Sequence, residues 1–314
     1  MAHRRLSEAE REERRRADRE RFERAARALL SSEGWQQWVQ VRSRNGLARY
    51  SFGNQLLIAS QRPEASFVAG FRAFLDLNRC VRKGERAIRI FAPMTTVRQL
   101  DTERTRPKGD SNEDPERLTL FRSVPVFDVA QTDPLPGREP VTLEPPREPI
   151  TGESHRHLLK PLRALARELG YSVSIRALKG SAEGWCDSRA REIVANSRLA
   201  PNGQVRVLVH ELAHALGIGY REFTRRQAEV LVDTVTFVVC ASCALDVSGE
   251  SVPYVAGWGE REGGLEAIRN YAERIDAVAR RIEDALHKDA RSTKHEQGHS
   301  HGRVPVELTA SERA

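Results

Sequence analysis

The stretch VRVLVHELAHALG, from Val205 to Gly217, decides the fold of the second half of this chain. It places His210, Glu211 and His214 inside an otherwise apolar run, and residues four apart lie on one face of a helix. Two imidazoles on one face can hold a divalent metal ion, and zinc accepts nitrogen ligands. Glu211 is displaced round the helix, where it can take a proton from a water molecule. An accidental match would bury three polar groups without partners, which is costly, so we expect a metal site.

A second apolar segment, FTRRQAEVLVDTVTFVVC from Phe223 to Cys240, is expected to supply the third ligand. Its only acids are Glu229 and Asp233, which are four apart and therefore share a helix face. We expect Glu229 to bind the metal and Asp233 to orient one of the histidines from behind. Two alternatives stay open: Asp233 is the ligand instead, or both acids lie on the wet side of an amphipathic helix.

These motifs resemble those of the gluzincin metallopeptidases, and more closely those of the ImmA/IrrE group of bacterial metallo-endopeptidase domains, over residues 155–287. The resemblance implies that His210, His214 and Glu229 are zinc ligands and that Glu211 is the catalytic base. The same donor set also suits manganese or cobalt. Tyr220 and Tyr254 are candidate donors to the oxyanion that forms during peptide hydrolysis.

The pattern around these motifs predicts a zincin-like domain over residues 151–290. We expect a helix over 157–170, strands over 171–175 and 190–195, the two metal-bearing helices, and a long helix from Gly264 to Leu286. In peptidase domains of this kind, an edge strand beside the active helix can hold an extended peptide. Residues 291–314, which contain HEQGHSH, are expected to form a disordered tail.

Composition describes a globular protein with basic and neutral parts. The 314 residues carry a formal net charge of +7, with 39% hydrophobic and 30% charged residues. Residues 31–98 hold a net +7, whereas residues 151–290 are balanced at zero. No apolar run reaches the ~18 residues that span a bilayer, and no export signal is evident. We therefore expect a cytoplasmic location and no membrane partner.

The first half is predicted to be a small basic α+β domain over residues 31–135, preceded by a charged helical arm over 1–30. An exposed insertion is expected over 99–117, and a Pro-rich connector over 136–150 leads to the second domain. Positive charge interleaved with aromatic residues suits single-stranded nucleic acid, because cations neutralise phosphates and exposed rings stack on bases. The alternative is that aromatic residues such as Trp35 and Trp38 form the core and the charges only keep the surface soluble.

The first half carries a series of motifs: Trp38, YSFGNQLLI from Tyr50, VAGF from Val68, VRKGE from Val81, and VPVFDVAQT from Val124 to Thr132. Over residues 31–135, their order and spacing resemble the N-terminal domain of ArdC-like plasmid antirestriction proteins. The resemblance implies that this domain binds single-stranded DNA and that a metallopeptidase-like domain follows it in the sequence. The candidate DNA contacts are Tyr50, Asn54, Arg82 and Lys83.

Two positions depart from that family's pattern. Phe74 stands where the family usually has tryptophan, which puts one stacking or packing contact in doubt. Asn78 replaces a glycine before the basic turn, and asparagine tolerates left-handed backbone.

The sequence therefore predicts a single-stranded DNA-binding protein with a zinc metallopeptidase-like domain, acting in antirestriction or in the protection of mobile DNA. Two alternatives remain. The chain is a zinc endopeptidase that cleaves a regulatory protein, or it is a non-catalytic DNA-binding protein whose metal is structural. The sequence leaves open whether the chain is an enzyme.

Overall fold

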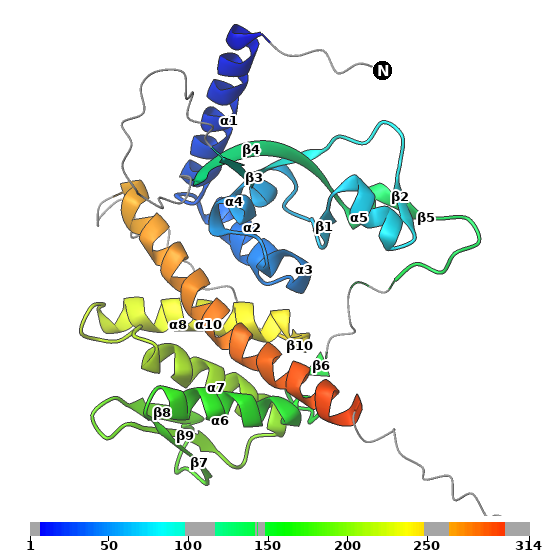
Figure 1. Cartoon of the computed structure of the whole chain (residues 1–314). Coiled ribbons are helices and arrows are strands. Elements are labelled where there is room, and N and C mark those ends of the chain that lie inside the picture. Colours follow the sequence, from blue (N-terminus) through cyan, green and yellow to red (C-terminus); the bar gives the residue numbers. More distant parts are fainter. Residues whose placement is uncertain (1–6, 98–116, 142, 144–147, 248–263, 299–314) are drawn as a thin grey trace, which may run out of the picture. The chain divides into compact units, whose positions relative to one another are not determined.

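The computed structural model describes residues 7–97, 117–141, 143, 148–247 and 264–298 (Figure 1). The chain divides into two compact units, and each is considered by itself. Of the described residues, the first unit holds those up to 143 together with 241–244 and 264–273. The second unit holds 148–240, 245–247 and 274–298. Helices and strands are mixed along the chain, so the fold class is α+β.

Serine side chains cap the first two helices of the first unit. The helices of this unit are α1 (Glu8–Ala28), α2 (Ser32–Arg42), α3 (Asn45–Ala48), α4 (Phe52–Gln61) and α5 (Phe71–Asp76). Ser7 and Glu10 form a reciprocal capping box at α1, and the Ser31 hydroxyl accepts the Gly34 N–H at α2. Ser51 precedes α4, but its side chain makes no cap hydrogen bond.

The core of this unit is built from the aromatic residues whose role was open. Trp35 and Trp38 are fully buried and meet edge to face, with ring centroids 5.2 Å apart. The Trp38 indole N–H donates to Gln55 Oε1 at 3.3 Å, so its polar group is satisfied inside the core. Phe74 is also fully buried, with its ring 6.0 Å from that of Phe67. These rings pack the interior and are not available to stack on bases.

The segment expected to be a solvated arm is helical, and its last turns join this core. Ala25 and Ala26 of α1 are buried, and α1 packs against α4. The Phe22 ring lies 6.5 Å from that of Phe91. The end of the basic helix is therefore fixed on the domain.

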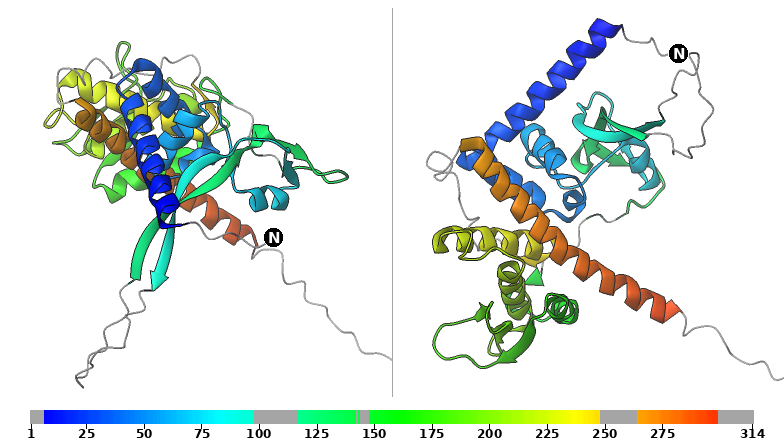
Figure 2. Two further views of the ribbon diagram at one scale, coloured as in Figure 1. Left: turned by 90° about the horizontal axis from the view of Figure 1, so that it is seen from above. Right: turned by 60° about the vertical axis from the view of Figure 1, so that its left-hand side comes forward.

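The strands of the first unit form two small sheets. One has the order β1-β4-β3, from Val68–Ala69, Arg117–Asp128 and Ile88–Val97, and the other pairs β2 (Arg79–Val81) with β5 (Thr132–Pro134). Figure 2 shows β3 and β4 running out together as an antiparallel pair. Asn78 has φ of 58°, so the left-handed turn before β2 is kept without glycine. Most of the predicted insertion over 99–117 and parts of the connector lie outside the described residues.

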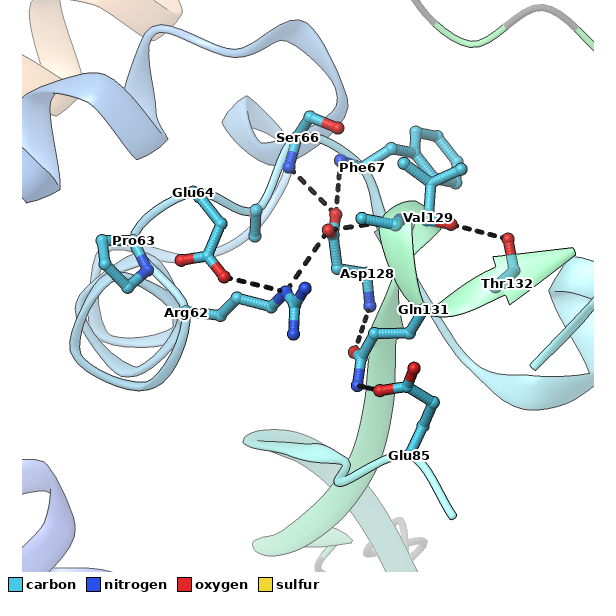
Figure 3. Close-up of polar contacts among 12 residues, drawn as sticks. Arg62, Pro63, Glu64, Ser66, Phe67, Glu85, Asp128, Val129, Gln131 and Thr132 are labelled. Atoms are coloured by element: carbon cyan, nitrogen blue, oxygen red, sulfur yellow. Dashed lines mark hydrogen bonds and ion pairs between the residues drawn. The ribbon is translucent and has the colours of Figure 1, made fainter. Parts of the chain in front are cut away.

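A buried carboxylate holds the loop after α4 against the end of β4 (Figure 3). Asp128 Oδ1 accepts the backbone N–H groups of Ser66 and Phe67 at 3.0 and 3.2 Å. Its Oδ2 lies 3.4 Å from Arg62 Nε, and the Asp128 N–H donates to Gln131 at the end of the short helix η1 (Val129–Gln131). A carboxylate with several donors is stable when buried. Asp128 is thus a fixed anion beside the Arg62 guanidinium, which also lies 3.3 Å from Glu64 Oε1.

The second unit contains a three-stranded sheet with the order β7-β9-β8. β7 (Ser172–Arg176) and β9 (Glu192–Asn196) are parallel, close to their predicted positions, whereas β8 (Gly184–Asp187) was not predicted and pairs with β9 in antiparallel fashion. A short parallel pair joins β6 (Glu148–Pro149) to β10 (Leu245–Asp246).

Helices cover this sheet (Figure 1). η2 (Arg156–Leu158) leads into α6 (Leu159–Glu168), which packs on β7, and α7 (Pro201–Ala215) packs on β8 and β9. α8 (Arg225–Ser242) follows, and α10 (Gly264–Gly298) continues beyond the predicted end at Leu286. Among the described residues, no helix combines the length and apolar character that crossing a membrane requires.

Candidate metal centre

The α7 helix presents the two histidines as the spacing predicts. Pro201 occupies the first turn of α7, and Gly217, with φ of 102°, follows its end. The rings of His210 and His214 have centroids 5.2 Å apart. Both side chains are mostly buried, so the pair lies in a partly enclosed site rather than on an open surface.

The second helix brings its two acids to this pair. Glu229 Oε2 lies 3.6 Å from His210 Nε2 and 4.0 Å from His214 Nε2. One ligand atom from each of these three residues lies within 4.8 Å of the others, which is close enough for a single metal ion to contact all three. Asp233 lies on the far side of one imidazole, with Oδ1 3.3 Å from His210 Nδ1. This geometry favours Glu229 over Asp233 as the carboxylate ligand.

Acceptors behind both imidazoles set their tautomers. Asp233 accepts at His210 Nδ1, and the Ile218 carbonyl oxygen lies 2.8 Å from His214 Nδ1. A carbonyl oxygen can only accept, so the proton of neutral His214 resides on Nδ1 and the Nε2 lone pair is left free. The same argument applies to His210. Both Nε2 atoms therefore face Glu229 as metal donors, which is the arrangement that histidine ligands normally show.

The two histidines differ in their affinity for protons. Burial lowers the pKa of His210, but the hydrogen bond to Asp233 and the nearby carboxylates outweigh burial and leave that pKa above its usual value. Burial lowers the pKa of His214 below its usual value, despite the bond to Ile218. Neutral His214 is the better metal ligand of the two in acid solution, because a ligand must first lose its proton.

Glu211 is a buried carboxylate beside this cluster. Its side chain is only 7% exposed, and burial raises its pKa to about 7. A group with a pKa near neutrality can both accept and return a proton under physiological conditions. Gly184 of β8 lies against it: a Cβ there would be 3.2 Å from Glu211 Oε1 and 2.7 Å from the Val194 carbonyl oxygen. The absence of a side chain at Gly184 leaves room for the carboxylate.

Two cavities open beside the cluster. One, of about 340 Å³, is lined by both histidines, Glu211, Glu229 and residues of β8. The other, of about 350 Å³, is reached from the Asp233 side. Tyr220 stands at the mouth of the first cavity, 57% exposed, and its hydroxyl donates to Glu229 Oε1 at 2.5 Å. Tyr254, the other predicted donor, lies outside the described residues.

The four predicted DNA contacts differ in whether their side chains already have partners within the protein. The Asn54 amide bonds the Phe91 backbone in both directions at 2.8 Å, and the Tyr50 hydroxyl donates to the Val68 carbonyl oxygen at 2.7 Å. Arg82 is held by Glu85 and Asp133. Lys83 is exposed and has no partner among the residues that the structure describes. Asn54, Tyr50 and Arg82 thus have structural roles that the sequence did not reveal.

Four arginines that the sequence did not single out converge on one cavity of the first unit, which we call the arginine cavity. It has a volume of about 420 Å³ and is lined by Arg21 and Arg24 of α1, Arg62 after α4, and Arg86 before β3. Arg62 is fixed by Asp128, and Arg21 pairs with Asp18. The side chains of Arg24 and Arg86 are exposed, and within the described part of the chain neither has a partner. These residues are far apart in the sequence, and only the arginine density of 1–30 could have indicated them.

Fold and site together define a class of protein: a basic α+β unit followed by a unit that carries an HExxH cluster on two helices. Comparison with known families gives a more specific result. Residues 26–127 match the N-terminal domain of anti-restriction factor ArdC. The first half of the chain is therefore similar to that domain, as the motifs predicted.

Similar structures and sequences extend the comparison. The metal-free crystal structure of the antirestriction protein ArdC from the R388 plasmid matches with a TM-score of 0.52 and 14% identity, covering 85% of this chain and 98% of that one. Its Mn(II)-bound form matches with a TM-score of 0.46 and 16% identity, covering 84% and 97%. The uncharacterized protein pXO2-81 of Bacillus anthracis is 27% identical over 262 residues, which are 74% of this chain. This chain spans 44% of that relative's length.

Proposed function

We propose that this chain is a single-stranded DNA-binding antirestriction protein whose second unit is a zinc metallopeptidase. The single observation that carries the hydrolytic half is the convergence of His210 Nε2, His214 Nε2 and a Glu229 oxygen within 4.8 Å, beside buried Glu211. The DNA half is supported by the match to the ArdC N-terminal domain.

The residues present fit a zinc ion. Two imidazoles held in the right tautomer and one carboxylate make a three-ligand set, which leaves a position open for water or substrate. A zinc ion bound there would supply Lewis-acid activation of water and of a peptide carbonyl group. Asp233 and the Ile218 carbonyl oxygen hold the imidazoles, and the Tyr220 hydroxyl holds Glu229 Oε1 so that Oε2 faces them.

Glu211 moves the proton in this proposal. Its carboxylate takes a proton from the attacking water and returns it to the nitrogen of the leaving amine. Burial favours this cycle because it brings the pKa of Glu211 to about 7, where one carboxyl group can both accept and return a proton near neutral pH. Tyr220 is a positioning residue in the state described. Substrate would approach through the cavity that Tyr220 borders.

The arginine cavity is where we place the phosphates of a single strand. Arginine presents a planar fork of donors that matches phosphate oxygens. Arg24 and Arg86 have no partner among the described residues and are available to bind, and Arg62 is already ion-paired with Asp128. Lys83 is an exposed cation of the same unit that can add a further phosphate contact.

The Glu211→Gln variant tests the hydrolytic proposal. The change keeps the size of the side chain and leaves the three ligands in place, so metal content and DNA binding should be retained. Protection of an incoming plasmid from restriction should fall to the level of cells without the protein. Full protection by a variant that still binds metal would contradict the hydrolytic proposal. It would favour a DNA-binding protein whose metal is structural.

A further inference from the structure

A basic groove runs along the second unit, away from the metal centre. It has a volume of about 690 Å³, and its walls carry Arg156, Lys160, Arg163 and Arg167, with Val173 and Ile175 of β7 on the other side. None of the described residues that line it is acidic. It also shares no lining residue with the two cavities beside His210 and His214. We call it the α6 groove.

The charge of the α6 groove is local. Residues 151–290 are neutral overall, so a groove lined by three cations of α6 and by Arg156 of η2 does not reflect a general property of this unit. The opposite face of α6 buries Leu162, Leu165 and Ala166, which anchors the helix and points the basic face outward. Arg156 pairs with Glu153, but the exposed side chains of Arg163 and Arg167 have no partner in the described part of the chain. The groove is therefore suited to a ligand with several negative charges.

The strand that borders the groove has a free edge. The Ser172 N–H donates to the Arg191 carbonyl oxygen at 2.9 Å, and the Arg176 carbonyl oxygen accepts from Ser197 at 3.0 Å, so both residues face β9. Backbone groups alternate in direction along a strand, which turns those of Val173 and Ile175 to the opposite edge. There, no strand among the described residues pairs with β7.

We propose that the α6 groove binds an extended acidic peptide, which adds a strand to the edge of β7. The ligand's backbone would pair with Val173 and Ile175, and every second side chain would lie on the face that those two side chains share. That face is the one over which the α6 cations lie, so carboxylates at alternate positions meet Arg163 and Arg167. A nucleic acid fits less well, because the groove offers no aromatic ring on which bases stack.

This proposal does not rest on hydrolysis at the metal centre, and its test avoids that site. A fluorescent peptide in which glutamate alternates with valine is titrated with the full-length protein, and binding is read as fluorescence polarisation. A peptide in which lysine replaces glutamate serves as the charge control. We expect the acidic peptide to bind in preference to the basic one.

Charge reversal tests whether the acidic peptide binds in the α6 groove. The double variant Arg163→Glu with Arg167→Glu should weaken binding of the acidic peptide by about tenfold or more. The matched control Lys179→Glu with Arg198→Glu makes the same change in charge at exposed positions of the same unit outside the groove, and should change binding less than twofold. Equal effects of the two double variants would overturn the proposal.

A backbone variant separates a peptide from a nucleic acid. Ile175→Pro removes the outward N–H without removing a bond to β9, whereas Ile175→Ala keeps that N–H. We expect proline to weaken peptide binding more than alanine does, with thermal unfolding showing that both variants fold. If proline and alanine act alike while single-stranded DNA displaces the peptide, the groove is a phosphate site and the proposal is wrong. If Ile175→Pro does not fold, the charge-reversal result decides.

Discussion

At the scale of single residues, Glu211 is the buried carboxyl group of the metal centre. Burial raises its pKa from 4.5 to about 7. For a carboxyl group with a raised pKa, the folded state holds the proton more tightly than the unfolded state. Its stabilising contribution is therefore present below pH ~4.5 and is lost as the pH rises through about 7.

We therefore expect Glu211→Gln to stabilise the metal-free protein increasingly as the pH rises. Relative to wild type, the gain between pH ~5 and pH ~8 should reach at most about 3 kcal/mol, the free energy equivalent of the pKa difference. Urea unfolding in the presence of a chelator measures it. A difference that does not change with pH would show that Glu211 is not buried as described.

Asn78 is the second residue with a sharp prediction, because its backbone is left-handed at φ of 58°. Asn78→Ala places a Cβ in a conformation that costs about 1 kcal/mol or more, and it also loses the amide bond to the Glu139 carbonyl oxygen. Asn78→Gly loses the same hydrogen bond, but glycine adopts the left-handed backbone conformation without a steric cost. The glycine variant should therefore be the more stable by about 1 kcal/mol in thermal unfolding. The reverse order would argue against the left-handed turn.

At the scale of elements, the pairing of α7 with α8 determines whether a metal can bind. Asp233→Asn weakens the acceptor behind His210 without removing a proposed ligand, and such a change lowers metal affinity by about 10–100-fold. Competition with a chromophoric chelator measures this. Glu222→Gln, which removes an exposed charge between the same helices, should leave the affinity unchanged. Complete loss of metal in Asp233→Asn would instead identify Asp233 as the ligand.

The elements also show what sequence patterns can and cannot predict. Helix spacing is local, so the four-residue repeats His210–His214 and Glu229–Asp233 were enough to predict which side chains share a face. The β8 strand was missed because GWCD is short and carries no alternating apolar pattern. The structural role of Asn54 was not predicted because its partner, the Phe91 backbone, is 37 residues away along the chain. Long-range pairing of this kind leaves no local signal.

At the scale of the whole molecule, basic charge and metal chemistry belong to different parts of the sequence. The concentration of charge before residue 98 was readable from the sequence, but the cavity that gathers it was not. Arg21, Arg62 and Arg86 come from three separate segments, and the packing of α1 and of β3 on α4 brings them together. Composition thus indicated a polyanion partner, whereas the fold identifies candidate contacts.

Reversing the free charges of the arginine cavity tests the DNA half. Arg24→Glu with Arg86→Glu should weaken binding of a labelled single strand and reduce its salt dependence. The slope of log K against log salt should shrink by about 1.4, roughly 0.7 for each lost phosphate contact. Arg19→Glu with Arg72→Glu makes the same charge change at exposed positions outside the cavity. If both pairs reduce the slope equally, DNA is attracted by net charge and not by this cavity.

The central claim is that two imidazoles and one carboxylate on neighbouring helices hold a single divalent ion. Elemental analysis of the purified full-length chain tests it, after His295, His299 and His301 are replaced by serine so that HEQGHSH cannot contribute ligands. We predict one metal ion per chain in that protein, and none after the further change His210→Ala or His214→Ala. A protein that carries no metal, or one whose metal content is the same with and without His210 and His214, would contradict the claim.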